Sequence, residues 1–417
     1  MNGIFIQSIY IEELRHLKNV QIDIDKNEKK HLIITGKNGS GKSTLLEAIK
    51  SYLKSIEDNS YSSRINSFEE VKKYEKLINE VKSNQELTES EKQYKIRQLE
   101  STFNNYKYYI DRYGNWIELE IMNGDKAQFQ YNDGNLIFSY FGAKRNSNVI
   151  TPNGVEKIEL SERYSIDNKP SLNFLRYLVD LKTQQSFARN EGDNKEADKI
   201  GLWFDSFENS LRNLMNQPEL KLKFDYKNYN FDIIESNKEP YGFNELSDGY
   251  SAVLDIVMDL IMRMEKKASR AYDLEGIVLI DEVETHLHIS LQKNIMTFLT
   301  SLFPNVQFIV TTHSPFVLNS IENAIIYDLE KKIKVEDLTM YSYEGIVEGY
   351  FNIDKYSQGI KSKVDRYAYL VGKNEKTDDE DVEMYELRKD LKNIPKDLAP
   401  ELYGRFLEIE IQRRTMI

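Results

Sequence analysis

A short glycine-rich stretch of this chain has the residue types and the spacing of a phosphate-binding loop. It consists of Gly36, Lys37, Asn38, Gly39, Ser40, Gly41, Lys42, Ser43 and Thr44. Its glycines let the backbone bring successive N–H groups close to phosphate oxygens, and Lys42 adds a positive charge. The hydroxyl of Ser43 is then placed to hold Mg²⁺. This spacing predicts a site for a nucleoside triphosphate.

Two carboxylates follow a second apolar run and suggest the chemistry of hydrolysis. Residues 277–280 are apolar, and Asp281 and Glu282 come directly after them. The carboxyl ends of parallel strands meet where α/β sheets bind ligands, so we expect both acids beside the loop. Asp281 is the predicted ligand of Mg²⁺. Glu282 is predicted to orient or deprotonate the attacking water.

Two further stretches complete the set of candidate site residues. Residues 308–312 predict another buried strand, which ends in His313, and we expect this histidine beside the acids and able to sense the γ-phosphate. Ser247, Asp248 and Gly249 precede an amphipathic helical pattern over residues 253–264. Ser247 can cap this helix and Gly249 leaves backbone exposed, but by itself this pattern fits any capped helix.

The elements that must position these residues have clear periodicity. Residues 32–34 indicate a strand before the loop and residues 45–49 a helix after it, so phosphates would sit on a helix N-terminus. The earlier alternating runs predict a small antiparallel sheet. Strands are predicted at residues 116–121 and 136–141, with Asp-Gly at 133–134 as a hairpin signal.

Composition limits the class of protein. The chain has 417 residues, enough for two or three domains or for one large domain with insertions. Its net charge is −12, so binding of nucleic acid would need a local basic groove. It contains no cysteine, which excludes disulfides, thiolate metal sites and cysteine nucleophiles. No apolar window approaches about 18 residues, and no leader pattern is present. These observations predict a cytoplasmic protein without a membrane segment.

Three helical regions surround the predicted site. Residues 62–110 are charged and have the pattern of an inserted helical hairpin, with a capping box from Thr88 to Glu91. A solvated packing arm is favoured there over an arm that grips a partner or DNA. Residues 165–216 predict a helical subdomain whose aromatic stripe belongs to the core. Residues 336–417 predict a charged helical region for assembly or partner docking.

Four stretches in this order resemble the ATP-binding cassette (ABC) ATPases. They correspond to Walker A (36–44), the signature (246–250), Walker B (277–282) and the switch histidine, His313. The resemblance implies an α/β fold of the P-loop NTPase class, with an ABC ATPase head over residues 1–335 that binds ATP and Mg²⁺. It further implies a head-to-tail dimer or higher homo-oligomer, in which the signature of one subunit completes the nucleotide site of another. ATP would close the pair and hydrolysis would open it.

Within that class, residues 282–288 and 312–315 resemble the SMC, RecF and OLD branch that handles DNA. No glutamine follows residues 137–141, where transporters carry their Q-loop; Lys144 and Arg145 stand there instead, facing phosphate or DNA, or else forming a solvated strand end. The fuller pattern at residues 140–145, 174–192, 203–214 and 350–357 is similar to PtuA-type ATPases of bacterial anti-phage systems such as Septu and certain retrons. This implies a nucleotide-gated regulatory or sensor ATPase with a separate HNH nuclease partner, and DNA or RNA as a further partner.

Two other functions stay open at this point. One is a DNA repair or chromosome-maintenance ATPase of RecF or SMC type. The other is an OLD-like nuclease, because residues 347–349 resemble the start of such a domain. No apolar strand ending in paired aspartates follows them, so an intrinsic nuclease is the less favoured interpretation.

Overall fold

The computed structural model describes residues 3–112, 116–145, 148–236, 238–268, 272–335, 338–350, 354, 356–396 and 399–415. They fall into two compact units, Met1–Met340 and Tyr341–Ile417. The first unit contains every residue predicted for the nucleotide site. The pattern at residues 350–357 lies partly outside the described residues. Among the described residues, no helix is long and apolar enough to cross a membrane.

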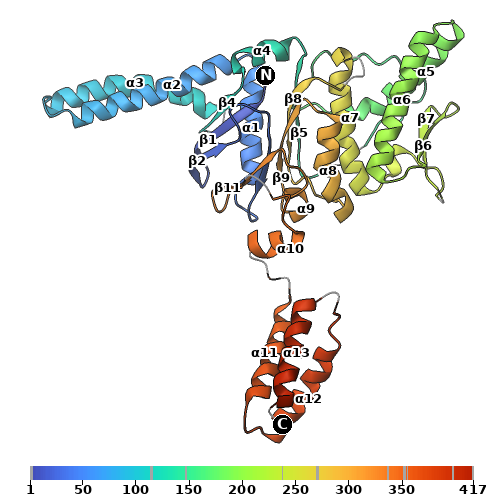
Figure 1. Cartoon of the computed structure of the whole chain (residues 1–417). Coiled ribbons are helices and arrows are strands. Elements are labelled where there is room, and N and C mark those ends of the chain that lie inside the picture. The colour runs from blue at the N-terminus through green and yellow to red at the C-terminus, as the bar shows by residue number, and fades with distance from the viewer. Residues whose placement is uncertain are drawn as a thin grey trace. The chain divides into compact units, whose positions relative to one another are not determined.

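A six-stranded sheet forms the centre of the first unit (Figure 1). Its order is β11-β10-β3-β9-β8-β5, and every neighbouring pair is parallel except β10 with β11. The strands are β3 (His31–Thr35), β5 (Leu136–Phe141), β8 (Glu275–Ile280), β9 (Val306–Thr311), β10 (Ala324–Asp328) and β11 (Ile333–Val335). A parallel sheet is covered on both faces, which explains why its strands are continuous apolar runs.

Each face of this sheet is covered by different elements. Helix α1 (Lys42–Glu57) and a small sheet lie on one face, in a core that includes Leu32, Ile34 and Leu279. Helices α7 (Asp248–Ala268) and α8 (Ile289–Leu302) lie on the other side (Figure 1). Short helix α9 (Pro315–Leu318) follows β9 and contacts α8. The predicted P-loop NTPase fold is therefore confirmed.

The small antiparallel sheet has the order β2-β1-β4. It contains β1 (Ile6–Leu14), β2 (Leu17–Asp23) and β4 (Trp116–Ile121). The hairpin predicted from Asp133 and Gly134 is wrong, because β4 and β5 lie in different sheets and α4 (Gly124–Asn132) comes between them. Gly134 has φ of 73° and its N–H donates to Tyr131 O at the end of α4. A helix C-terminus and a hairpin turn both use glycine at positive φ, so the local pattern fits either.

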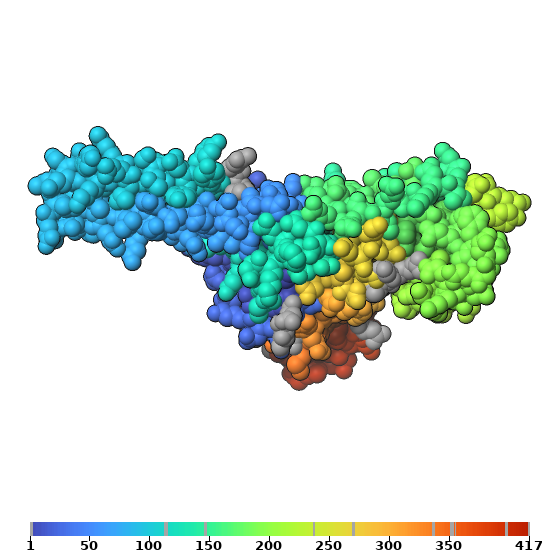
Figure 2. Space-filling model, turned by 90° about the horizontal axis from the view of Figure 1, so that it is seen from above, coloured from blue at the N-terminus to red at the C-terminus, as the bar shows by residue number. Residues whose placement is uncertain are grey.

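The predicted helical hairpin is present as α2 (Tyr61–Ser83) and α3 (Glu89–Arg112). Figures 1 and 2 show it extending from the rest of the first unit. Thr88 N–H donates to Glu91 Oε2, and Glu91 N–H donates to Thr88 Oγ1, which confirms the capping box.

The helical subdomain begins with η1 (Pro170–Asn173) and continues through α5 (Phe174–Asn190) and α6 (Asn194–Met215). A two-stranded sheet follows, formed by β6 (Lys221–Asp225) and β7 (Asn230–Ile234), and then η2 (Phe243–Glu245). Phe174, Trp203 and Phe207 are buried and pack together, so the aromatic stripe belongs to the core as predicted.

The second unit is helical. It contains α10 (Tyr343–Gly345), η3 (Ile346–Tyr350), α11 (Gln358–Gly372), α12 (Asp378–Lys392) and α13 (Pro400–Thr415). Helices α11, α12 and α13 share a core that includes Val364, Tyr367, Leu391 and Phe406. Within it, Arg388 donates two hydrogen bonds to Glu410, at 2.9 and 2.8 Å, which joins α12 to α13.

Candidate nucleotide site

The glycine-rich loop between β3 and α1 takes a conformation that requires its glycines. Gly36, Gly39 and Gly41 have φ of 135°, 83° and 97°. A Cβ at Gly36 would also lie 2.8 Å from Ser40 Oγ. A residue with a Cβ is strained at such φ angles, so glycine at these positions lets the loop form its tight turn.

Lys42 is the first residue of α1, and its buried ammonium lies against the loop. Its Nζ donates to Gly36 O at 2.8 Å and to Lys37 O at 3.2 Å. Burial lowers the pKa of Lys42, while the carboxylates of Glu282 and Asp281 act in the opposite direction. The ammonium therefore lies close to the acids at the end of β8.

The remaining loop residues are more accessible. Lys37, Asn38, Gly39 and Ser43 are exposed, and Ser40 and Thr44 are half-buried. Lys37 forms an ion pair of 2.8 Å with Glu330, which follows β10. The exposed hydroxyl of Ser43 stands on the first turn of α1, where a helix N-terminus favours anions.

Asp281 and Glu282 are held by the neighbouring strand β9. The Thr311 hydroxyl donates to Asp281 Oδ1 at 2.6 Å and accepts the Glu282 N–H at 2.7 Å. Asp281 is buried and Glu282 half-buried. Glu282 has φ of 46°, a left-handed conformation that costs a non-glycine residue about 1–2 kcal/mol. Such a cost is typical of functional turns, where surrounding contacts maintain the strained backbone.

His313 follows β9 and is tied to a third carboxylate. The backbone N–H of His313 donates to Glu284 Oε1 at 2.5 Å, while Glu284 Oε2 is buried with no hydrogen-bond partner among the described residues. Burial and then the Lys42 ammonium lower the pKa of His313, against the effect of Glu284. Glu284 was not among the predicted site residues. Its position two residues after Glu282 was the only signal in the sequence.

A second residue that sequence reasoning missed comes from the turn between β1 and β2. His16 Nε2 lies 3.0 Å from Ser40 O of the loop. A Cβ on Gly41 would lie 3.3 Å from His16 Cε1 and 3.2 Å from Leu17 Cδ1. This turn therefore packs on the loop. The contact joins segments that are distant in the sequence, so no local sequence pattern predicts it.

The helix start of the signature stretch packs against the segment that follows the two acids. Ser247 and Asp248 are exposed, and Gly249 is buried with its Cβ direction 2.9 Å from His286 O. Ser251 N–H donates to Ser247 O, so helical hydrogen bonding begins at Ser247. Within the described residues, no hydrogen bond joins these three residues to residues 36–44.

Arg145 does not lie where the sequence suggested. We expected Lys144 and Arg145 to face phosphate or DNA, or to form a solvated strand end. Lys144 is exposed, but Arg145 is only 3% exposed. Its guanidinium donates hydrogen bonds to the backbone carbonyls of residues 281–283. These carbonyl groups accept hydrogen bonds from the N–H groups of the guanidinium, which offsets the cost of burying the cation.

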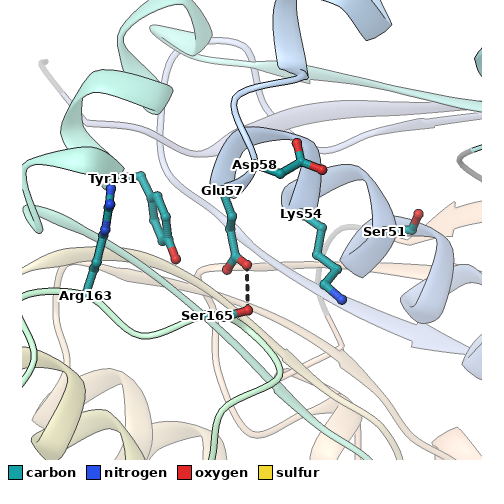
Figure 3. A pocket seen from close by; sticks show the side chains of 7 residues that line it. All are labelled: Ser51, Lys54, Glu57, Asp58, Tyr131, Arg163 and Ser165. Atoms are coloured by element: carbon teal, nitrogen blue, oxygen red, sulfur yellow. Dashed lines mark hydrogen bonds between the residues drawn. The ribbon is translucent and has the colours of Figure 1, made fainter.

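A polar cleft of about 600 Å³ lies at the opposite end of α1 from the loop (Figure 3). It is lined by Ser51, Lys54, Glu57, Asp58, Tyr131, Arg163 and Ser165. Glu57 in its wall accepts hydrogen bonds from Ser165 Oγ and Ile166 N. The cleft contains none of the predicted site residues, and we assign it no part in the nucleotide site.

A phosphate loop after β3, carboxylates after β8 and a histidine after β9 define the class as a P-loop ATPase. The chain belongs to the family described as "AAA domain, putative AbiEii toxin, Type IV TA system", which matches residues 32–319. A second family, described as "AAA ATPase domain", matches residues 5–55.

Three bacterial proteins are among the relatives of this chain. Septu protein PtuA of Bacillus mycoides (strain KBAB4) is 33% identical over 136 residues, 30% of this chain and 19% of the relative. Retron Ec83 probable ATPase of Escherichia coli is 39% identical over 101 residues, 24% of this chain and 19% of the relative. Retron Vc95 probable ATPase of Vibrio cholerae serotype O1 biovar El Tor is 24% identical over 384 residues, 76% of this chain and 72% of the relative.

These matches confirm the resemblance to PtuA-type and retron ATPases, although the first two relatives are matched over only 19% of their length. Among solved structures, an SMC head bound to the C-winged helix domain of ScpA aligns with a TM-score of 0.39 and 12% identity. That alignment covers 79% of this chain and 96% of the SMC chain.

The charges around His313 lead to a testable prediction. Replacing Glu284 by Gln removes a charge that raises the pKa of His313, so that pKa should fall further below its ordinary value. Lys42→Met removes a charge that lowers it, and the pKa of His313 should rise. Titration of the histidine NMR signals measures both shifts. The exposed Glu322→Gln serves as the matched control. An unchanged His313 pKa in Glu284→Gln would contradict the arrangement described above.

Proposed function

We propose that this chain binds ATP with Mg²⁺ and hydrolyses it at a composite site formed between two copies of the chain. We further propose that it is the nucleotide-gated regulatory or sensor subunit of a bacterial anti-phage defence complex and controls a separate HNH nuclease. The observation that carries the proposal is the meeting of the loop, the acids and His313 at one sheet edge, together with the exposure of Ser247 and Asp248 to solvent. The similarity to Septu and retron ATPases supports the biological setting.

In this proposal each site residue has a separate role. The loop N–H groups and Lys42 bind the phosphates. Glu282 orients or deprotonates the attacking water. Ser43 and Asp281 would hold Mg²⁺, since one is an exposed hydroxyl and the other a carboxylate fixed by Thr311, both oxygen donors of the kind Mg²⁺ prefers. When bound, Mg²⁺ would neutralise phosphate charge. His313 donates a hydrogen bond at the γ-phosphate.

The Ser247 turn supplies the gating step of the proposal. Ser247, Asp248 and Gly249 lead into α7, a helix of 21 residues with its N-terminus at this turn. Unpaired N–H groups at a helix start attract anions, so this turn would bind the γ-phosphate held by the loop of a second copy. ATP then favours the closed pair because only that state makes these contacts, and hydrolysis removes them.

The second unit supports a role in assembly or partner docking, which we propose for residues 336–417. Its surface exposes Val382, Tyr385 and Ile411, which are 60%, 67% and 63% exposed. Val382 and Tyr385 lie three residues apart on α12, so they are neighbours on its surface, and contiguous exposed apolar side chains are typical of docking surfaces. The residues proposed for ATP chemistry all belong to the first unit.

Glu282→Gln tests the role of the proposed general base. The amide keeps the size of the side chain but cannot accept the proton, so ATP binding should persist while hydrolysis falls ~10²–10⁴-fold. Turnover is measured by phosphate release, and the ATP-bound oligomer by light scattering. We expect the substituted chain to accumulate as the closed pair. Wild-type turnover in this variant would remove Glu282 from the role.

Mixing two inactive variants tests the composite site. Lys42→Ala should lose ATP binding, and Ser247→Arg should bind ATP but not hydrolyse it. In a head-to-tail pair of the two, one site has both an intact loop and an intact Ser247 turn, so the mixture should regain activity that neither variant has alone. If every site were built within a single chain, mixing would restore nothing.

Co-purification with a genomically adjacent HNH protein tests the defence proposal. We expect a complex whose cleavage of DNA or RNA depends on the nucleotide state of this chain, altered by Glu282→Gln. Metal-dependent cleavage by the purified chain alone would instead support an OLD-like nuclease. A chain that neither binds an HNH protein nor cuts nucleic acid would favour the repair or chromosome-maintenance ATPase.

A further inference from the structure

Arg145 is a buried cation attached to the turn that carries the proposed catalytic acid. Its Nη1 donates to Asp281 O at 2.6 Å and to Gly142 O at 2.9 Å. Its Nη2 donates to Glu282 O at 2.9 Å and to Val283 O at 3.3 Å. Three successive carbonyl groups after β8 therefore point at one guanidinium, and the backbone of this turn curls around it.

The guanidinium is suited to this position. It presents several N–H donors in one rigid plane, whereas an ammonium is a point charge on a flexible stem. Burial lowers the pKa of Arg145, and the carboxylates of Glu284, Asp255 and Asp281 act in the opposite direction, favouring the cation. The group is thus an interior cation that is compensated by carbonyl dipoles and nearby acids.

The strained backbone of Glu282 makes these contacts consequential. Its left-handed φ of 46° is unfavourable for a residue with a side chain, so other contacts must hold it. On one side the Thr311 hydroxyl accepts the Glu282 N–H. On the other side Arg145 binds the Glu282 carbonyl. Together, Thr311 and Arg145 fix the backbone N–H and the backbone carbonyl of Glu282, the residue whose carboxylate is proposed to act on water.

We propose that Arg145 is a positioning residue for hydrolysis, which holds the backbone of residues 281–283 so that the Glu282 carboxylate faces its water. The inference rests on the proposed function. Arg145 acts through the backbone, because the hydrogen bonds of its Nη1 and Nη2 go to carbonyl groups of the chain.

The segment that carries Arg145 is also tied to the approach to the Ser247 turn. Val149 N–H donates to Asn244 Oδ1 at 3.0 Å, and Asn244 Nδ2 donates back to Val149 O at 3.0 Å. Asn244 precedes Ser247 by three residues. Arg145 thus lies four residues before the partner of Asn244 in the sequence, while its guanidinium contacts the turn that carries Glu282.

Arg145→Lys and Arg145→Ala test the proposal in the full-length chain. Both should still bind ATP, while kcat falls about 10²-fold, the scale expected when a reacting group is displaced by roughly 1 Å. The loss should vanish in the Glu282→Gln background, because Arg145 acts through Glu282. A role in folding alone would instead lower both backgrounds equally. Guanidinium added at low concentration should partly restore kcat of Arg145→Ala.

Arg263→Ala is the matched control, since Arg263 is equally buried and donates to the carbonyls of Tyr164, Ser165 and Asn168 away from the site. It should lower stability without a specific fall in kcat and without guanidinium rescue. Wild-type kcat in Arg145→Lys, or losses that multiply with Glu282→Gln, would overturn the proposal.

Hydrogen exchange separates this inference from the proposed function. Amides of residues 281–285 should exchange faster in both Arg145 variants and not in Arg263→Ala, whether or not the wild-type chain hydrolyses ATP. Unchanged exchange there would refute the positioning role even if ATP hydrolysis is established. Faster exchange in the Arg145 variants, combined with a wild-type chain that has no ATPase activity, would instead refute the proposed function alone.

Discussion

The parallel pairing of β3, β9 and β8 is the constraint on which the whole site depends. These three strands are neighbours in the sheet, and each ends at the same edge. The glycine-rich loop follows the first, His313 the second and Asp281 the third. Lys42 and Asp281 are far apart in sequence, yet this pairing places them close enough for their charges to interact. A shift in strand order would separate the phosphate-binding groups from the acids.

The site also depends on a balance of buried charge. Lys42 and Arg145 are cations, while Asp281, Glu282 and Glu284 are carboxylates, so the acids exceed the cations. A triphosphate is strongly anionic, and the two cations are already near carboxylates. In the proposed site, backbone N–H groups of the loop, the N-terminus of α1 and Mg²⁺ would therefore supply much of the attraction for phosphate. Removing one of these charges by substitution should therefore be destabilising, because the buried ion that remains has lost its partner.

The additional elements are inserted where they leave the sheet edge unchanged. The hairpin of α2 and α3 lies between α1 and β4 in the sequence and packs through its base, where Phe68, Val71 and Ile110 are buried. The helical subdomain lies between β5 and α7, and so separates the strand before Arg145 from the helix led by Ser247. Insertions at these two points can vary in size without moving the loop or the acids, since neither interrupts the strands that carry them.

The sequence alone determined the glycine-rich loop, the strand end that carries the acids, the helix starts and the helical hairpin, because each of these depends on local chemistry. Positive φ at Gly36 and Gly41, the apolar run before Asp281 and the reciprocal cap of Thr88 and Glu91 each depend on neighbouring residues. Only the tertiary structure decided that Asp133 and Gly134 end a helix, that β10 joins the sheet beside β3, and that Arg145 is buried behind Glu282. These outcomes depend on partners far along the chain, and a segment's own pattern does not specify which distant backbone will accept its hydrogen bonds.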